Sequence, residues 1–309
     1  MNKISLIIPT KNRTQDVIRC LKSISIQTIL PDEIIIVDSS NTDELKPKLN
    51  TFTLNIRYIR SEPGLTHQRN IGIKSSSGGI IIFLDDDVTI DKDYIKEIIY
   101  VFNHYPPEVI GGVTGEILNK EREKGLIQKF RELISKVFAI LFFLLRYGNG
   151  RFQLSGFPTI IRSGSISRIT NVEFLYGCNM AFRKKIINRF KFDENLLGHG
   201  WGEDDDIAYR ISRKYQNIYT PFAKLMLNSF SPSTGGNNYN ITKKMIEYHY
   251  YLFKKNLPHD FIHQFAFWWS VIGLFLQEFI RFIKKTSSNN GRLSGLISGI
   301  QKILTNKAK

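Results

Sequence analysis

Residues 80–94 read "IIIFLDDDVTIDKDY": five apolar residues run directly into three consecutive aspartates, Asp85, Asp86 and Asp87. A short apolar run that ends at polar residues predicts a buried strand. Carboxylates crowded at the end of such a strand repel one another, which raises their pKa values unless a cation neutralises them. Mg²⁺ takes one or two protein carboxylates and completes its shell with water and substrate phosphates. The stretch therefore predicts a strand ending at a metal and phosphate site, although a solvated acidic turn would explain the triplet taken alone.

Further apolar runs precede and follow this one. They occupy residues 4–10, 33–38, 55–60 and 108–117. Helix-like segments separate them, and one of these, "DKDYIKEIIYVF", starts at a candidate N-cap, Asp91. Strands that alternate with helices predict an α/β fold with a mixed, mostly parallel, Rossmann-like sheet flanked by helices.

Polar residues end three of the first four runs. They are Pro9, Thr10, Lys11 and Asn12 after the first, Asp38, Ser39 and Ser40 after the second, and the aspartate triplet after the fourth. Ligands bind beyond the carboxyl ends of parallel strands. One site built from several strand ends is therefore the economical interpretation, and the alternative is three ordinary loops.

A second acidic cluster lies far along the chain in "GHGWGEDDDIAYRISRK". Its acids, Glu203 to Asp206, open a predicted helix, where acids also suit the helix dipole. Four of them exceed what capping needs. One carboxylate could therefore act as a general base on a hydroxyl acceptor. Trp201 could form an apolar platform for a sugar ring.

The chain resembles the family-2 glycosyltransferases, which have the GT-A fold. The stretches that carry the resemblance, in the family's order, are "ISLIIPTKNR", "EIIIVDSS", "GLTHQRNIGIKSSSGGIIIFLDDDV", "FLYGCNMAFRK" and "GWGEDDDIAYR". They span most of residues 1–232. The resemblance implies an inverting enzyme that moves a sugar from a UDP-, GDP- or dTDP-linked donor.

On the donor side, the resemblance implies a nucleotide pocket lined from the first strand and its turn by Pro9, Thr10, Asn12 and Arg13. Asp38 resembles the aspartate that contacts the base, and Arg69 and Asn70 resemble the "RN" pair near the phosphates. In the triplet, Asp87 would be the main ligand of Mg²⁺ or Mn²⁺. Asp85 or Asp86 would face the ribose or a metal-bound water, and Asp85 is a second candidate metal ligand.

On the acceptor side, the resemblance makes Asp204 the catalytic base, with Glu203 beside it. The segment "GCNMAFR", which contains Gly177 and Asn179, resembles the wall of the sugar site. The usual companions of the second acidic motif are Asp206 and Arg210.

Two departures from the family pattern matter. Many relatives carry a metal-binding histidine where this chain has Asn228, so the completion of the metal shell is open. The "QxxRW" motif of processive synthases is missing, since "QKFRE" at Gln128 lacks the Trp and lies in the wrong region. We therefore expect transfer of one or a few sugars.

The sequence divides into a glycosyltransferase domain and a basic extension. The predicted segments are a domain of residues 1–240, made of a nucleotide-binding half (1–118), a helical insertion (119–150) and an acceptor half (151–240), and a helical extension (241–309). The net charge is 43 − 28 = +15, and the last segment has eleven Lys or Arg against three acids. A strongly basic chain implies an acidic partner, either nucleic acid, an anionic membrane or a phosphorylated substrate.

Two apolar stretches bear on membrane contact. The run Val137–Leu145 is too short to span a bilayer, and basic residues flank it, so it is either an interfacial helix or a core helix. Residues 265–283 are marginal for spanning, and Trp268 and Trp269 with nearby cations suit an interfacial anchor. We expect contact with an anionic membrane surface, and a lipid-linked or other glycan acceptor handled at the cytoplasmic face. The alternative is a helical hairpin packed on the catalytic domain.

The cysteines and the N-terminal residues bear on the cellular compartment. Two distant cysteines, Cys20 and Cys178, make no disulfide framework and favour a reducing compartment. The N-terminus resembles no secretory signal, so we expect a cytoplasmic protein. Competing interpretations are a nucleotidyltransferase that makes nucleotide sugars, an inactive relative, and a basic binding protein. We expect no nucleic-acid partner, because no such motif is evident, and the oligomeric state is open.

Overall fold

The computed structural model describes residues 3–118, 125–228, 237–284 and 291–305. The chain forms two compact units, and each combines two separate segments of the sequence. The first unit contains residues Met1–Asn119 and Arg162–Ser231, and the second contains Lys120–Ile161 and Pro232–Lys309.

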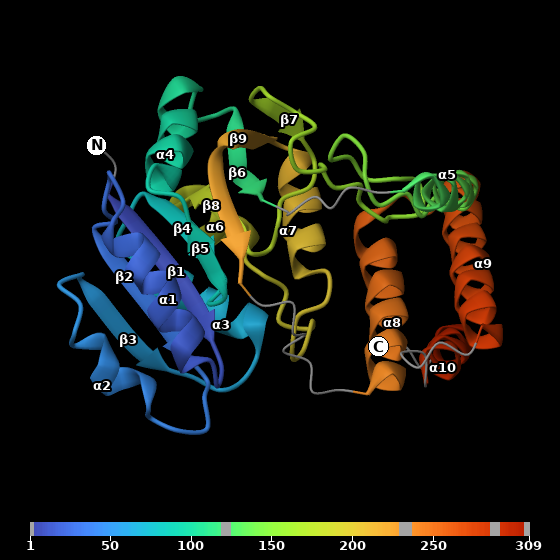
Figure 1. The fold of residues 1–309 in the computed structure, drawn as a ribbon, viewed down its shortest axis with the longest axis horizontal. Coiled ribbons are helices and arrows are strands. Elements are labelled where there is room, and N and C mark those ends of the chain that lie inside the picture. The colour runs from blue at the N-terminus through green and yellow to red at the C-terminus, as the bar shows by residue number, and fades with distance from the viewer. Residues whose placement is uncertain (1–2, 119–124, 229–236, 285–290, 306–309) are drawn as a thin grey trace. The chain divides into compact units, whose positions relative to one another are not determined.

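The first unit is an α/β layer structure (Figure 1). Its strands are β1 (Ile4–Thr10), β2 (Glu33–Asp38), β3 (Ile56–Arg60), β4 (Ile80–Leu84), β5 (Val88–Ile90), β6 (Ile110–Ile117), β7 (Thr170–Val172), β8 (Asn179–Arg183) and β9 (Gln216–Leu227). Its helices are α1 (Thr14–Ser25), α2 (Leu45–Leu49), α3 (Leu65–Ser75), α4 (Tyr94–His104), α6 (Lys184–Phe190) and α7 (Glu203–Ser212).

Within the described residues these strands form one sheet of nine, in the order β3-β2-β1-β4-β8-β6-β9-β5, with β7 paired to β9. Strands β3, β2, β1, β4, β6 and β9 run in one direction, and β8, β5 and β7 run in the other. The mixed, mostly parallel sheet predicted from the sequence is confirmed. Because β1, β2 and β4 are parallel neighbours, the polar residues that follow them meet at one edge.

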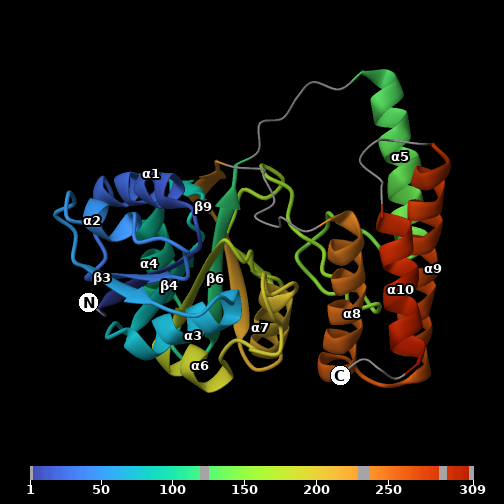
Figure 2. The same ribbon diagram turned by 90° about the horizontal axis from the view of Figure 1, so that it is seen from below.

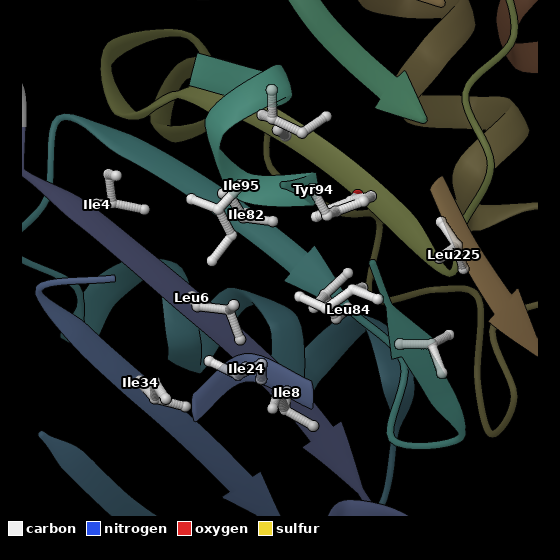
Figure 3. Packing of buried hydrophobic residues seen from close by; sticks show 14 of the residues in the cluster. Ile4, Leu6, Ile8, Ile24, Ile34, Ile82, Leu84, Tyr94, Ile95 and Leu225 are labelled. Carbon is white, nitrogen blue, oxygen red and sulfur yellow. The ribbon is translucent and has the colours of Figure 1, made fainter. Parts of the chain in front are cut away.

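Helices cover both faces of the sheet, so its central strands are apolar on both sides. Alternate residues of β1 point to opposite faces, and Leu6 and Ile8 pack on the face that α1 and α4 cover, whereas Ile7 lies on the face of α3, α6 and α7. Figure 3 shows Leu6 and Ile8 close to Ile24 of α1, and Ile82 close to Ile95 of α4. This packing fixes the register of β1, since a shift by one residue would exchange the two faces.

Helix α4 begins later than the predicted N-cap at Asp91. The backbone carbonyl of Asp91 accepts hydrogen bonds from the Tyr94 amide (2.9 Å) and from Gln27 Nε2 (2.7 Å). Residue Asp93 precedes the helix, and its carboxylate accepts from Thr28 Oγ1 (3.0 Å). The turn is therefore tied to the end of α1, which delays the start of the helix.

The second unit is helical (Figure 2). Its helices are α5 (Leu126–Leu141), α8 (Asn238–Asn256), α9 (Phe261–Ile283) and α10 (Arg292–Leu304). Helix α5 ends before the predicted apolar run does, because Phe143 adopts a left-handed backbone with φ 51°. Helix α10 lies in the helical extension predicted over residues 241–309, although no separate helix was predicted there.

The predicted insertion and the predicted extension thus belong to one unit. Residues 151–161, which the sequence placed in the acceptor half, also lie in it. The Ser155 hydroxyl donates to the Phe143 carbonyl (2.9 Å), and His249 Nε2 lies 3.1 Å from the Ser155 carbonyl. These contacts tie the loop to α8.

Helix α9 is, among the described residues, the one helix whose length and apolar composition would suffice to cross a membrane. About 33% of its most apolar window is buried inside the protein. Its inner face packs with α8 and α10 through Phe267, Val271 and their neighbours. Length and composition alone do not distinguish a spanning helix from a packed one.

Candidate active site

The three aspartates after β4 engage different partners. The Asp86 carboxylate points inward, where it accepts hydrogen bonds from Thr10 Oγ1 (2.7 Å) and Arg13 (3.0 Å). The same guanidinium donates to Asp87 (2.8 Å). Asp85 instead accepts from Arg69 (3.1 Å). The end of β1 and the end of β4 are therefore joined through Asp86, while Asp85 and Asp87 retain partly exposed side chains, at 36% and 13%.

Burial raises the pKa values of two of these aspartates, Asp85 and Asp86. Burial raises the pKa of Asp86 to about 7, against the opposing effect of Thr10 and Arg13. Burial also raises the pKa of Asp85 to about 6, and the carboxylates of Asp87 and Asp204 add to the shift. Burial is the main cause of both raised pKa values, and the hydrogen bonds and charges of Arg13 and Arg69 offset it only in part.

Arg69 connects the two acidic clusters. It lies on α3, only 1% exposed, and its guanidinium donates to Glu203 at the start of α7 and to Asp85 after β4. It also donates to the Gly177 carbonyl (2.8 Å), and its guanidinium carbon lies 5.2 Å from the centre of the Phe192 ring. A buried guanidinium needs such partners on its donors, so Arg69 holds β4, α7 and the loop before β8 in one arrangement.

Asp204 lies beside this bridge at the first turn of α7. Its Oδ2 accepts from the Gly177 amide (3.1 Å), and its Oδ1 accepts from the Asp205 amide (3.0 Å). Burial raises the pKa of Asp204, and the charge of Arg69 opposes that shift. Burial, together with the charge on Asp204, also raises the pKa of Glu203. A carboxyl with a raised pKa is suited to accept a proton near neutral pH.

A glycine-rich turn delivers α7 to this position. Gly198, Gly200 and Gly202 all have positive φ, which glycine adopts without strain. The Glu203 amide donates to the Gly200 carbonyl (2.8 Å), which closes the turn. Trp201 stands 37% exposed on this turn, so its ring is available to an acceptor.

Several predicted site residues are engaged in holding the fold. The Asn179 side chain is wholly buried and its Oδ1 accepts from Thr114 (2.8 Å) and the Gly115 amide (2.6 Å). Asn70 bonds both backbone groups of Phe192, at 2.9 and 3.0 Å. Both side chains therefore bond neighbouring backbone, and Asn70 also donates to Glu194 (2.8 Å).

The predicted companions Asp206 and Arg210 contact each other and the neighbouring backbone. Asp206 is 1% exposed, and Arg210 donates to it at 2.7 Å. Arg210 also donates to the carbonyls of Phe190 and Lys191, each at 2.7 Å. The pair fastens α7 to the end of α6.

On the nucleotide side, Asp38 is fully buried and its carboxylate is occupied. It accepts from the Ser40 amide (2.7 Å) and from the Tyr58 hydroxyl (2.8 Å). Asn12 has a left-handed backbone with φ 55°, and its Oδ1 accepts from the Asn41 amide (2.9 Å). Both residues shape the turns after β1 and β2, and Pro9 lies in register with Val37 between those strands.

The sequence did not single out Gln68, which joins the same strand ends. Its buried amide donates to the carbonyls of Thr10 (2.9 Å) and Val37 (2.7 Å). Its position directly before Arg69 in the "RN" stretch was the available signal. Its partners are backbone atoms brought together only by the sheet.

The acidic strand end fits a divalent metal as a partial site. Within the described ranges no group of three or more His, Cys, Asp or Glu side chains is arranged to hold an ion. Asp85 and Asp87 supply two partly exposed carboxylates. Asn228 lies next to them. Its backbone amide donates to the Asp87 carbonyl (2.8 Å), and its side-chain amide donates to Thr89 Oγ1 (2.6 Å). Two carboxylates suit Mg²⁺ or Mn²⁺ when donor phosphates and water complete the shell.

A match to a known family agrees with this geometry. The family model described as glycosyl transferase family 2 matches residues 5–190 of the chain. The chain belongs to glycosyltransferase family 2. The matched region contains the aspartate triplet, Arg69 and the loop at Gly177. This assignment favours the glycosyltransferase interpretation over the nucleotidyltransferase and binding-protein alternatives.

Among characterised proteins, the O-antigen chain rhamnosyltransferase RfbN of Salmonella typhimurium is 37% identical over 107 residues. That match covers 33% of this glycosyltransferase and 33% of the relative. This chain spans 16% to 38% of the length of seven curated relatives, RfbN among them. The sequence similarity to these relatives therefore covers only part of their length.

Solved structures share the fold. The mannosyltransferase PcManGT from Pyrobaculum calidifontis, in complex with GDP-Man and Mn²⁺, aligns with a TM-score of 0.59 at 16% identity, over 99% of this chain and 88% of its own. TarS of S. aureus, in complex with UDP-GlcNAc, aligns with a TM-score of 0.61 at 14% identity, over 97% and 81%. The GT-A fold predicted from the sequence is confirmed.

Proposed function

We propose that this glycosyltransferase moves one or a few sugars from a nucleoside diphosphate sugar to a hydroxyl group of a glycan or lipid-linked glycan, with inversion of the anomeric centre. The acceptor would be a precursor of a cell-surface polysaccharide. The donor could carry UDP, GDP or dTDP. PcManGT holds GDP-Man and TarS holds UDP-GlcNAc, so relatives of this fold accept more than one nucleotide.

The observation that carries the proposal is the position of Arg69 between Asp85 and Glu203. These two acids are far apart in the sequence, and the guanidinium brings their clusters to one place. The triplet is suited to the diphosphate side of a donor, and the first turn of α7 to the acceptor side. A donor and an acceptor could therefore meet between them.

The proposed chemistry is a single in-line displacement. Asp204 accepts the proton of the acceptor hydroxyl while that oxygen attacks the anomeric carbon, and the bond to the nucleoside diphosphate breaks. The Gly177 amide holds Oδ2 of Asp204, which orients the carboxylate. Arg69 keeps Asp85 and Glu203 in place without reaching the solvent. A bound Mg²⁺ or Mn²⁺, held by Asp87 and Asp85, would neutralise charge on the leaving diphosphate.

We further propose that the enzyme works at the cytoplasmic face of the cell membrane. The helical unit carries 19 of the 43 basic residues against 6 acids, a net charge of +13. A lipid-linked acceptor would lie at such a surface, and anionic lipids attract basic segments.

The test is sugar transfer and donor hydrolysis with a panel of nucleotide sugars in Mg²⁺ or Mn²⁺. Asp204→Asn should abolish turnover but leave donor affinity intact. Asp205→Asn is the matched control, because it makes the same chemical change one residue along α7 and should retain most activity. Full turnover by Asp204→Asn would refute the base assignment. Failure of every nucleoside diphosphate to bind in either metal would refute the donor site.

A further inference from the structure

Helix α9 is apolar on the face that points away from its own unit. Phe261, Phe265, Ile272, Phe279 and Ile283 are 82%, 53%, 47%, 42% and 62% exposed. Their spacing of four, seven, seven and four residues places them on one stripe along the whole helix. A helix on the surface of a soluble domain normally shows polar residues there, so this stripe needs a partner.

The inner face of α9 is, by contrast, partly polar. Ser270 is wholly buried, and Glu278 is 5% exposed. Glu278 accepts from Arg281 (2.6 Å) and, across the unit, from Arg292 of α10 (3.2 Å). These contacts hold the inner face of α9 against α10, so only the outward side of the helix is open to lipid.

Helix α5 presents a second exposed apolar face. Its exposed apolar residues, each more than half exposed, are Phe130, Leu133, Ile134, Val137, Ile140 and Leu141. Its C-terminal end is fastened to α9, because Trp269 Nε1 donates to the Leu141 carbonyl (2.8 Å) and the Phe142 and Trp269 rings stack at 5.1 Å. Both views of the ribbon show α5 and α9 next to each other (Figures 1 and 2).

The net charge differs strongly between the two units. The helical unit has 19 basic and 6 acidic residues, a net charge of +13, and the sheet unit has 24 and 22, a net charge of +2. Lys129, Arg131 and Lys136 lie on α5 itself. Two copies of so basic a unit would repel each other, whereas an anionic bilayer would attract it.

We propose that the outward stripes of α9 and α5 together dock the protein on an anionic lipid bilayer, with both helices lying in the interface and neither crossing it. Membrane docking does not depend on the proposed function, but its purpose, access to a lipid-linked acceptor, rests on that function. Apolar side chains enter the boundary between headgroups and acyl chains, and the surrounding cations meet the lipid phosphates.

Vesicle flotation with the full chain tests the proposal. We expect wild-type protein to float with vesicles of phosphatidylcholine and phosphatidylglycerol, to float poorly with phosphatidylcholine alone, and to be released by high salt. The variant Ile272→Glu/Phe279→Glu places two charges on the α9 stripe and should lower vesicle binding by about tenfold or more.

The control variant Asn50→Glu/Asn103→Glu adds the same two charges at exposed positions of the sheet unit and should float like wild type. Circular dichroism checks that both variants fold, and Phe261→Glu at the end of the stripe provides a milder second variant. Wild-type protein that stays in the soluble fraction at low salt would overturn the proposal, as would equal flotation of the stripe and control variants. A wild-type dimer that the stripe variant dissociates, without vesicle binding by either, would assign the surface to a second copy.

The flotation result is independent of catalysis. If the stripe variant still transfers sugar to a soluble acceptor, the active site is intact and only docking has changed. If no sugar transfer is found but flotation behaves as expected, the docking surface stands and the proposed reaction fails.

Discussion

The buried bridge from Arg69 to Glu203 makes a quantitative prediction. Arg69→Met keeps an unbranched side chain, although a shorter one, and removes the charge and the hydrogen bonds to Glu203, Asp85 and the Gly177 carbonyl. Removing one partner of a buried ion pair costs about 3–5 kcal/mol, because the other charge is left without compensation. We expect Arg69→Met to lower the free energy of unfolding of the sheet unit by that amount.

A double-mutant cycle isolates the pair. Glu203→Gln removes the charge that Arg69→Met leaves stranded, so the double variant should be more stable than the sum of the single losses predicts. The expected coupling is about 1–3 kcal/mol. Urea unfolding measures the free energies, and calorimetry of nucleoside diphosphate binding with Mn²⁺ reports the donor site. We expect Arg69→Met to weaken that binding by about tenfold, because Asp85 loses the partner that positions it.

Arg210→Met is the control for this cycle. Arg210 also pairs with a buried acid, Asp206, and bonds two backbone carbonyls. Its loss should destabilise the protein comparably and leave the donor affinity of the folded fraction unchanged. The reasoning is refuted if Arg69→Met and Glu203→Gln are additive, which would mean that the two side chains do not stabilise each other. It is also refuted if both arginine variants weaken donor binding equally.

Three further outcomes are expected. Gly177→Ala would place its Cβ 2.9 Å from Asp204 Oδ2, so sugar transfer should fall at least about tenfold while urea unfolding changes little, and unaltered kcat would contradict the assigned position of the base. Asn179→Ala removes buried bonds to Thr114 and Gly115 and should cost about 1–3 kcal/mol of stability, measured by urea unfolding, whereas an unchanged midpoint would show that those bonds contribute nothing. Burial lowers the pKa of His249 from 6.5 to about 4, so the stability that depends on its neutral form is complete above pH 6.5 and is lost as the pH falls toward 4. Thermal unfolding should therefore show a loss of about 1–2 kcal/mol between pH 7 and pH 5, and His249→Phe should remove this loss. A His249→Phe variant that keeps the same pH dependence would exclude His249 as its source.

Much of the fold could be predicted because its signals are local. Each of the strands β1, β2 and β4 is an apolar run that ends at a polar residue, and runs of that kind predict parallel strands and a shared site beyond them. The start of α7 could also be predicted, since four acids follow a glycine-rich turn. Helix α10 was not distinguished within the predicted helical extension, because its two buried glycines, Gly295 and Gly299, resemble loop residues until α8 packs against them.

The sequence by itself determined the family, the polar residues that follow the central strands, and the two acidic clusters. These features depend on residue types at fixed spacing. Tertiary structure alone decided which partners those residues contact. Asp86, Asn70, Asn179 and the Asp206–Arg210 pair hold the fold, because their partners come from elements distant in sequence or from backbone atoms. Packing also decided that Arg69 is buried between the clusters, and that α9 turns its most apolar stripe outward. The residue types limit which chemistry is possible, and the packing of the chain determines which side-chain atoms are engaged with other parts of the fold.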